Sequence, residues 1–381
     1  MKDNIVIAGI GQTTVGEHWQ YSIRELAHFA LEAAIKDAGG LRPQALFVGN
    51  MLAPNLSKQA HLGALIADFS GLVGIEAVSI EAAGASGGAA LRQGYLAVKS
   101  GMIDVALVVG VEKFTDMVDS GVEDALATAT DSDFEAVQGL TPTTQAALLM
   151  RRYLHEYNLP ADALAGFPIT AHANAVANPN AMFRRAIKAS TYARAGMVSE
   201  PLNIFDAAPP ADGAAAIILT RSELLPAHQQ IGAARILGSA SAVDTLSLHD
   251  RKDILLFDAA RRSASSALKK AGVTREQISF FEYHDAYSIY AALSLEAIGF
   301  AERGKGWELA RDGEISEGGK IPCVTMGGLK ARGFPGGATG VYQAAEAVTK
   351  LKHACESGGI ALIQSLGGPA STAITHLLTI D

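Results

Sequence analysis

Apolar residues recur along the chain in two alternating patterns, one typical of strands and one typical of amphipathic helices. A short apolar run at residues 5–10 predicts a strand, and the apolar positions of residues 22–38 recur at helical spacing. Gly39 and Gly40 end that helix, and a second strand-like run follows at residues 45–48. Strands that alternate with helices predict an α/β architecture.

The same order of elements returns in the second half of the chain. In each half a helical pattern ends at glycine before a strand-like run, and a second helix opens at a small residue followed by glycine. The corresponding segments are residues 22–48 and 257–283, and then residues 86–110 and 339–363. The offsets are similar, which predicts two related α/β halves, residues 1–228 and 229–381.

Residues 115–200 interrupt this order. They contain an acidic, turn-rich stretch at residues 116–133, a helical pattern at residues 144–157, and a basic stretch with Arg184, Arg185 and Lys188. We interpret them as an inserted helical subdomain. Guanidinium and ammonium groups bind phosphates well, so Arg184 and Lys188 are candidate ligand contacts. A solvated helix face explains the same basic cluster.

Composition and charge exclude several classes of protein. The 381 residues are 49% hydrophobic, enough for a large core, and the net charge of -8 is spread without long like-charge runs. We therefore expect neither a nucleic-acid-binding surface nor a polybasic membrane surface. The N-terminal stretch is too short for a signal peptide and no apolar run reaches transmembrane length, so we expect a cytoplasmic protein. Cys323 and Cys355 lack metal-ligand spacing, and we expect structural thiols.

A turn of very small residues, Ala82-Ala83-Gly84-Ala85-Ser86-Gly87-Gly88, stands between the strand-like residues 77–80 and a helical pattern. Amides at a helix N-terminus can stabilise an anion, so this turn is a candidate oxyanion site. A tight packing turn has the same composition.

Three C-terminal segments are candidates for chemistry. His284 follows a strand and can donate to a carbonyl oxygen, hold a water or exchange a proton, although it can equally well bond only to neighbouring backbone. Residues 327–340 are so rich in glycine that we expect a loop for close backbone approach to a ligand, not a packed element. This loop lacks the Walker spacing of a nucleotide site. Gly367 directly follows a strand, where its amide is a candidate oxyanion donor.

In this order and spacing, together with Ala211-Asp212-Gly213, these segments resemble the thiolase family over residues 4–380. The resemblance is nearest to the archaeal and sterol-carrier-protein type. It implies the five-layered α/β/α/β/α fold with two pseudo-symmetric halves and an inserted loop domain at residues 115–200. It also implies a homodimer that acts on acyl-CoA, with coenzyme A as part of the substrate and neither a metal nor a permanently bound cofactor.

The resemblance further implies coenzyme A contacts at Arg184, Lys188, Ala208 and Pro209. For the archaeal type it implies a small OB-fold partner protein that helps to bind coenzyme A. Neither a nucleic acid nor a membrane is among the implied partners.

The covalent machinery of this family is missing from the matching positions. The nucleophilic cysteine falls on Gly84, and the histidine of the family's Gly-His-Pro motif falls on Phe334. The positions of the other family cysteines hold Ser365 and Ala286. His284 is the one member of the usual set that remains, and the paired loss indicates natural divergence. Cys323 lies on a strand before the glycine-rich loop, but no obvious base adjoins it, and we do not expect a relocated nucleophile.

Two classes of function therefore stay open. The first is a thiolase-like enzyme that acts on acyl-CoA thioesters without ordinary thiolysis. Backbone donors near Gly84 and Gly367, with His284, would stabilise an enolate in aldol or retro-aldol chemistry. Thiolase-like aldolases carry tyrosines where this chain has His284 and Phe334, so Tyr287 and Tyr290 are candidate proton donors. The second class is a non-catalytic acyl-CoA-binding subunit of a complex.

Overall fold

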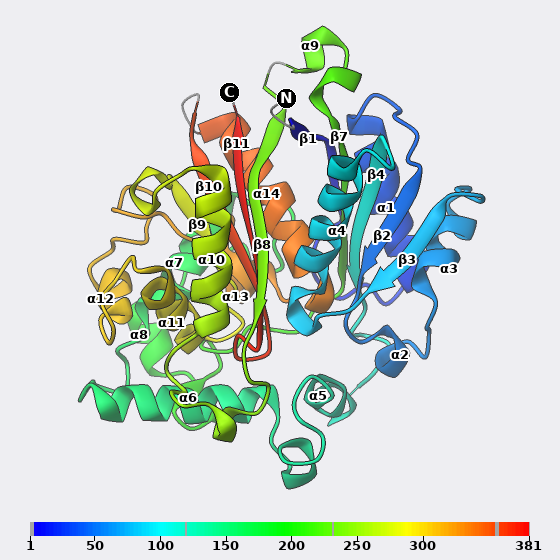
Figure 1. Ribbon diagram of the computed structural model, residues 1–381. Helices are drawn as coiled ribbons and strands as arrows, with labels where there is room; N and C mark the ends of the chain where they lie inside the picture. The colour runs from blue at the N-terminus through cyan, green and yellow to red at the C-terminus, as the bar shows by residue number, and fades with distance from the viewer. Residues whose placement is uncertain (1–3, 119, 231, 355–357, 381) are drawn as a thin grey trace.

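A nine-stranded mixed sheet runs through the computed structural model, which describes residues 4–118, 120–230, 232–354 and 358–380 (Figure 1). In their order across the sheet, the strands are β3 (Glu76–Ile80), β2 (Ala45–Gly49), β4 (Val105–Glu112), β7 (Gly213–Arg221), β1 (Ile5–Gln12), β8 (Ala234–Val243), β11 (Thr372–Ile380), β10 (Ile360–Gly367) and β9 (Phe280–Glu282). The apolar runs that predicted strands all lie in this sheet.

The sheet consists of two halves that meet at a short antiparallel contact. There Val6 and Ile7 of β1 pair with Arg235 and Ala234 of β8. Away from this contact, β1 continues along β7, and β8 continues along β11. The small number of pairs lets the two halves turn their faces toward each other.

Each half repeats one topology. The first half runs β1, α1 (Ile23–Asp37), β2, α4 (Ser86–Ser100), β4 and β7, and the second runs β8, α10 (Asp258–Ala271), β9, α14 (Thr339–Ala354), β10 and β11. In the first half, β2 pairs with β3. The counterpart in the second half is a single parallel bridge between Phe281 and Cys323. The predicted duplication is confirmed. The predicted division at residue 228 falls within α9 (Ala227–Gln230), and the boundary itself stays a prediction.

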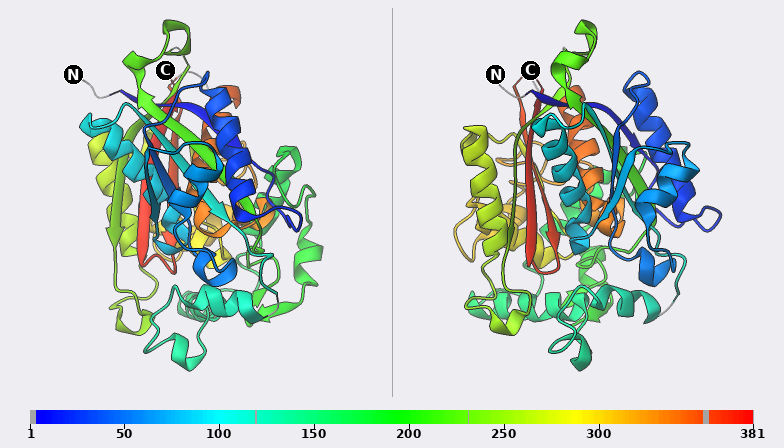
Figure 2. Two further views of the ribbon diagram at one scale, coloured as in Figure 1. Left: turned by 90° about the vertical axis from the view of Figure 1, so that its right-hand side faces the viewer. Right: turned by 45° about the vertical axis from the view of Figure 1, so that its right-hand side comes forward.

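The helices form three layers around the two half-sheets. Helices α4 and α14 pack on each other and on strands of both halves, so they form the central layer (Figures 1 and 2). Helix α1, with α3 (Leu62–Phe69), covers the outer face of the first half, and α10 covers that of the second. Helix α11 (Ser288–Ile298) packs beside α10. This arrangement confirms the predicted five-layered α/β/α/β/α fold.

The central helices approach so closely at their N-termini that only glycine fits. A Cβ atom on Gly87 would lie 2.7 Å from the Gly337 carbonyl oxygen, and one on Gly340 would lie 2.2 Å from the Gly88 nitrogen. Both distances are below ordinary contact, and the opposing atoms belong to the backbone. These glycines therefore bring the two helix starts, and the loops before them, to one point in the molecule.

The inserted segment forms a helical cap at one end of the two half-sheets (Figures 1 and 2). Helix α6 (Pro142–Glu156) begins at a capping box between Thr141 and Thr144, with Pro142 at its first position. The remaining short elements are α2 (Ala53–Leu56), α5 (Ser120–Ala127), α7 (Gly166–Asn174), α8 (Ala189–Ala193), β5 (Met197–Ser199), β6 (Leu202–Asn203), α12 (Gly306–Arg311) and α13 (Gly328–Arg332).

The structure corrects two predictions about local conformation. Arg184, Arg185 and Lys188 precede α8 in irregular chain, so they do not form a helix face. The glycine-rich residues 327–340 are buried and contain α13 and a 3₁₀ turn, whereas a loop without packed elements was expected. Backbone packing against neighbouring loops explains the glycines, because a Cβ on Gly337 would lie 2.6 Å from the Met51 nitrogen.

A buried carboxylate ties these loops together. Glu112, at the end of β4, accepts hydrogen bonds from the backbone nitrogens of Met51, Leu52 and Gly337 and from the side chain of Asn50. Burial raises the pKa of Glu112 to about 7, although these donors favour the charged form. The carboxylate therefore links the loop after β2 to the glycine-rich loop beside the central helices.

We expect Glu112→Gln to destabilise the fold. The glutamine amide places N–H groups against N–H donors, and one unsatisfied buried group costs about 1–3 kcal/mol, so the free energy of unfolding should fall by about 2 kcal/mol or more. Urea unfolding followed by circular dichroism measures this change. Glu32→Gln, on the exposed face of α1, is the matched control. An unfolding free energy equal to that of the control would show that the carboxylate does not link these loops.

Candidate functional site

The predicted segments converge on one small cavity. Its volume is about 40 Å³, and it lies where the turn before α4, the chain after β9, the chain after α13 and the end of β10 meet. The residues that line it are Met51, Gly84, Leu126, Ala129, Pro142, His284, Ala286, Tyr287, Tyr290, Phe334, Leu366 and Gly368. The structure therefore brings Gly84, His284 and Phe334 together, while the chemical role of each residue stays a prediction.

Gly84 is held in close contact on the side where a side chain would stand. A Cβ atom at this position would lie 2.7 Å from the Leu366 carbonyl oxygen and 3.0 Å from Cε1 of His284. Ala83, just before it, has a φ of 50°, in the left-handed region that residues other than glycine seldom occupy. The turn is therefore closed around Gly84 and leaves no space for a side chain at this position.

His284 is the polar side chain nearest to that turn. It is 3% exposed, and its Nδ1 atom has no hydrogen-bond partner within the described part of the chain. Burial, with a smaller contribution from the Arg332 guanidinium, lowers the pKa of His284 to about 3. The imidazole is therefore neutral at physiological pH, so it can donate one hydrogen bond but is a poor proton acceptor.

Phe334 places an apolar ring beside His284 in the small cavity. The ring meets His284 edge to face, with centroids 5.7 Å apart and an interplanar angle of 85°. It lines both the small cavity and a larger one beside it, as do Tyr287, Ala286 and Leu126. These four residues therefore form the wall between the two cavities.

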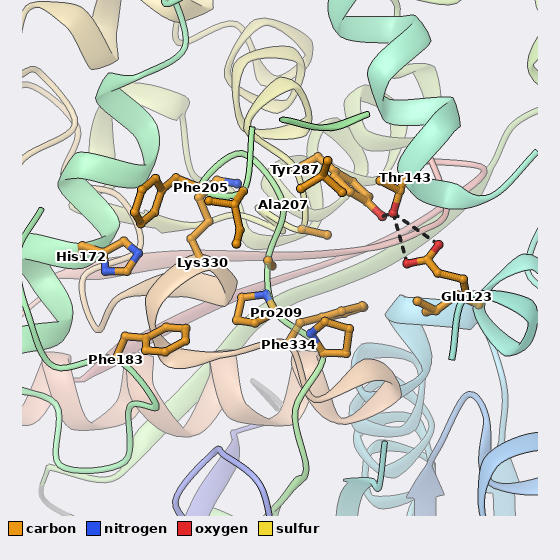
Figure 3. Close-up of a pocket in the computed structure, with 16 residues that line it drawn as sticks. Glu123, Thr143, His172, Phe183, Phe205, Ala207, Pro209, Tyr287, Lys330 and Phe334 are labelled. Carbon is orange, nitrogen blue, oxygen red and sulfur yellow. Dashed lines mark hydrogen bonds between the residues drawn. The ribbon is translucent and has the colours of Figure 1, made fainter. Parts of the chain in front are cut away.

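The larger cavity has a volume of about 380 Å³, within the usual range of small-molecule sites, and Figure 3 shows its lining. Most of its lining is apolar. The residues are Glu123, Leu126, Thr143, His172, Phe183, Val198, Ile204, Phe205, Ala207, Ala208, Pro209, Pro210, Ala286, Tyr287, Lys330 and Phe334. Ala208 and Pro209 line it as part of the loop before β7, whereas Arg184 and Lys188 are exposed and do not line it.

Apart from Tyr287, sequence reasoning missed the polar residues of the larger cavity. Lys330 is buried, and its Nζ donates to the Asp206 carbonyl oxygen at 2.6 Å, while burial lowers its pKa to about 8. His172 is held between Phe183 and Phe205, and burial lowers its pKa. Lys330 lies in the glycine-rich segment, so the sequence offered a signal for it. No local sequence pattern distinguishes His172, Glu123 or Thr143 as site residues.

Gly367 lies on the other side of the turn. It lines a third cavity of about 310 Å³ with Ala82, Ala83 and Glu81, whereas its neighbours Leu366 and Gly368 line the small cavity. A Cβ on Gly367 would lie 2.7 Å from the Ala82 carbonyl oxygen, so glycine permits this contact between strand and turn. Its role as an oxyanion donor stays a prediction.

Cys323 is fully buried and lines none of these cavities. Its Sγ atom lies 3.1 Å from the Ile321 carbonyl oxygen. Burial, with the neighbouring Glu282 and Asp285 carboxylates, raises the pKa of the thiol well above its ordinary value. These surroundings fit a structural thiol. Cys355 lies outside the described residues.

Comparison with known proteins decides the family. The model described as "Thiolase, N-terminal domain" matches residues 5–223, and the model described as "Thiolase C-terminal domain-like" matches residues 240–380. The chain belongs to the thiolase family. This membership confirms the resemblance seen in the sequence. The two cavities and the closed Gly84 turn are therefore features of a thiolase-family protein.

Three curated relatives match nearly the whole chain. An acetyl-CoA acetyltransferase of Methanothermobacter thermautotrophicus is 40% identical over 100% of both chains. The benzoylsuccinyl-CoA thiolase subunit BbsB of Thauera aromatica is 30% identical over 93% of this chain and 91% of its own length. The sterol carrier protein 2 of Gallus gallus is 26% identical over 99% of this chain and 70% of its own length.

Solved structures share the fold. The Ltp2-ChsH2(DUF35) aldolase superposes with a TM-score of 0.82 at 22% identity, covering 99% of this chain and 98% of the other. Human mitochondrial 3-ketoacyl-CoA thiolase superposes with a TM-score of 0.76 at 18% identity, covering 100% of this chain and 99% of the other. At these identities the likeness shows the fold alone.

Two further observations bear on partners. No helix in the described ranges is long and apolar enough to cross a membrane. Within those same ranges, no group of three or more histidine, cysteine, aspartate or glutamate side chains is placed to hold a metal ion.

We expect that restoring a side chain at Gly84 disturbs the fold and does not restore thiol chemistry. Gly84→Ala and Gly84→Cys should each lower the free energy of unfolding by about 1–3 kcal/mol, because the Cβ atom meets the Leu366 backbone. Gly16→Ala, where a Cβ meets nothing within 4 Å, is the control. Urea unfolding measures the change, and intact-protein mass spectrometry after addition of acetoacetyl-CoA tests Gly84→Cys. A stable Gly84→Cys protein that acquires an acetyl group would contradict the closed turn.

Proposed function

We propose that this thiolase-family protein acts on acyl-CoA thioesters without an acyl-enzyme intermediate, and that its reaction makes or breaks a carbon–carbon bond by aldol or retro-aldol chemistry. The observation that carries the proposal is the closed Gly84 turn, in contact with the Leu366 backbone and the His284 ring. Phe334 supports it, since an apolar ring cannot activate a nucleophile. Covalent acyl transfer through a cysteine at this turn has no place in such a site.

The small cavity keeps groups suited to an enolate. The His284 Nδ1 atom and the Tyr290 hydroxyl are buried and lack hydrogen-bond partners within the described residues. Both residues line the small cavity, and buried polar groups are rarely left unpaired, so each marks a place for a ligand oxygen or a water. A thioester carbonyl oxygen placed there would accept hydrogen bonds that strengthen as it becomes an enolate oxygen. This is the stabilisation that retro-aldol cleavage requires.

The larger cavity supplies a site for the apolar body of the substrate. Its aromatic and proline lining suits the pantetheine arm or the acyl group, and it reaches the small cavity at Phe334. We propose that Ala208 and Pro209 contact this arm and that the exposed Arg184 and Lys188 contact the phosphates of coenzyme A. Coenzyme A thus enters as part of the substrate.

A non-catalytic acyl-CoA-binding subunit is the second candidate. The low pKa of His284 favours it, because a histidine that stays neutral cannot exchange protons near pH 7. Either function is compatible with a partner. One solved structure with the same fold is an aldolase complex with a DUF35 protein, and we propose that this chain likewise works with a small OB-fold partner that helps to bind coenzyme A.

We also propose a homodimer built on the edge strand β3. Its pattern is mostly exposed, and Val78 is 49% exposed in the single chain. An exposed strand at a sheet edge presents unpaired backbone groups to a second strand.

Val78→Lys should therefore shift the protein toward the monomer. Sedimentation velocity over a range of concentrations measures this shift, with the exposed Val73→Lys substitution outside β3 as the control. A wild-type chain that sediments as a monomer at all concentrations would rule out the β3 dimer.

The function itself predicts a defined set of products. Incubation with 3-hydroxyacyl-CoA thioesters should release a shorter acyl-CoA and an aldehyde or ketone, whereas acetoacetyl-CoA with free coenzyme A should give no thiolysis. His284→Ala should lower kcat for cleavage by about 100-fold, the usual effect of removing one oxyanion donor. Liquid chromatography with mass spectrometry follows both products. His249→Ala, at an exposed histidine, is the control.

The outcomes separate the candidates. Thiolysis of acetoacetyl-CoA above the level of the His284→Ala variant would overturn the proposal. Tight binding of acyl-CoA without any turnover would favour the binding subunit.

A further inference from the structure

Three side chains form a hydrogen-bonded chain along the wall of the larger cavity. The Tyr287 hydroxyl lies 3.0 Å from Oγ1 of Thr143, and this Oγ1 lies 3.4 Å and 3.5 Å from the two carboxylate oxygens of Glu123 (Figure 3). Tyr287 follows the His284 motif, whereas Thr143 begins α6 and Glu123 lies on α5 of the inserted segment. The chain thus joins the site to the inserted helices.

The hydrogen bonds between these three side chains run in one direction. A carboxylate only accepts hydrogen bonds, so the Thr143 hydroxyl donates its proton toward Glu123. That hydroxyl has a single proton, so its oxygen accepts from the Tyr287 hydroxyl. The phenolic oxygen of Tyr287 is then free to accept a proton from a bound substrate. Both hydroxyl groups therefore donate in the same direction, from the site toward the Glu123 carboxylate.

The two ends of the chain have suitable surroundings. Tyr287 is buried and lines both the small and the larger cavity, so its phenol reaches the place where acyl-CoA would lie. Glu123 is partly exposed and lines the larger cavity, and no described cation forms an ion pair with it. Burial raises the pKa of Tyr287, which keeps the phenol protonated and makes it a poor base without a second acceptor. Glu123 supplies that acceptor.

The other ionisable groups near the site do not take this role. His284 is neutral and holds a proton poorly because its pKa is about 3. Lys330 donates to the Asp206 carbonyl oxygen and is grouped with His172 across the cavity from Thr143 and Glu123 (Figure 3). Among the described groups that line the two cavities, Glu123 is the only carboxylate.

We propose that Tyr287 is a catalytic residue that takes the hydroxyl proton of a 3-hydroxyacyl-CoA. Thr143 and Glu123 act through Tyr287 as positioning residues: Thr143 passes a proton on, and the Glu123 carboxylate accepts it. The inference rests on the proposed function and names the proton path that the retro-aldol reaction needs. It also assigns the inserted helices a part in the chemistry.

The step balances without another reactant. The substrate hydroxyl proton passes to the Tyr287 oxygen as the Tyr287 proton passes to Thr143 and the Thr143 proton to Glu123. The O–H electron pair forms the carbonyl bond, the Cα–Cβ bond breaks, and its pair becomes the thioester enolate, whose oxygen accepts a hydrogen bond from His284. The proton then returns from Glu123 to the enolate carbon. The products are an aldehyde or ketone and a shorter acyl-CoA.

Kinetics of five variants of the full chain test the relay. Glu123→Gln, Thr143→Val and Tyr287→Phe should each lower kcat for 3-hydroxyacyl-CoA cleavage by about 100-fold or more, the usual range for general acid–base catalysis. In Glu123→Gln, KM should change by less than about 3-fold, because in this proposal Glu123 acts through Thr143 and does not contact the reacting hydroxyl. Asp124→Asn, at the exposed neighbour of Glu123 on α5, is the matched control and should keep the wild-type rate. The double variant Glu123→Gln/Thr143→Val should be no slower than the slower single variant, since the two residues act in one path.

Chemical rescue separates a proton acceptor from a structural contact. Added formate should restore at least about 10-fold of the rate lost in Glu123→Ala, and it should leave Thr143→Val unchanged because the middle of the path is still broken. Circular dichroism and urea unfolding confirm that each variant is folded.

The results distinguish the relay from the function on which it rests. A wild-type chain that cleaves 3-hydroxyacyl-CoA, with an unchanged kcat in Glu123→Gln, would overturn the relay and leave the proposed function standing. A loss in Glu123→Ala that formate does not restore would likewise overturn it. A wild-type chain that binds acyl-CoA but shows neither cleavage nor exchange of the Cα protons with deuterated water would overturn both.

Discussion

Close backbone packing where the two halves meet is the constraint on which the rest of this structure depends. The starts of α4 and α14 touch at Gly87 and Gly340, and the turn before α4 touches the end of β10 at Gly84. A Cβ at any of these points would fall within 3.0 Å of a backbone atom. The same contacts that join the pseudo-symmetric halves therefore also shape the site, because the turn at Gly84 packs against the end of β10.

Buried charges fix the loops around that junction. Glu112 binds the loop after β2 and the glycine-rich loop, and Arg332 pairs with Glu346 at 2.7 Å with both side chains buried. A buried ion pair adds little net stability, but breaking one partner is costly, so such pairs favour one arrangement of the loops. Burial lowers the pKa of His284, and the Arg332 guanidinium lowers it further. Burial, together with this charge, thus keeps the histidine neutral, which favours hydrogen-bond donation over base catalysis.

The sequence predicted the architecture well because strands, helices and their repetition leave local patterns. It predicted which segments meet, since the turn at Gly84, His284 and Phe334 fall in recognisable surroundings. It was wrong about residues 327–340, because glycine content marks close packing as well as open loops, and only the contacts made by Gly337 distinguish the two. It did not find Glu123 or Thr143, which reach the site from inserted helices far along the chain. No local pattern encodes that contact.

The arrangement of the site suggests how a thiolase framework can serve another reaction. Thiol chemistry needs a nucleophile and a base, whereas the Gly84 side of the small cavity presents a crowded glycine and the apolar ring of Phe334. Cleavage without a covalent intermediate needs instead a donor for the enolate and an acceptor for a hydroxyl proton. His284 remains on the first side, and Tyr287 stands in the wall toward the larger cavity with a hydrogen-bonded path behind it. Proton transfer would then take place on the wall that faces the departing carbonyl product, so the fold can keep its junction closed and still separate the two halves of a substrate.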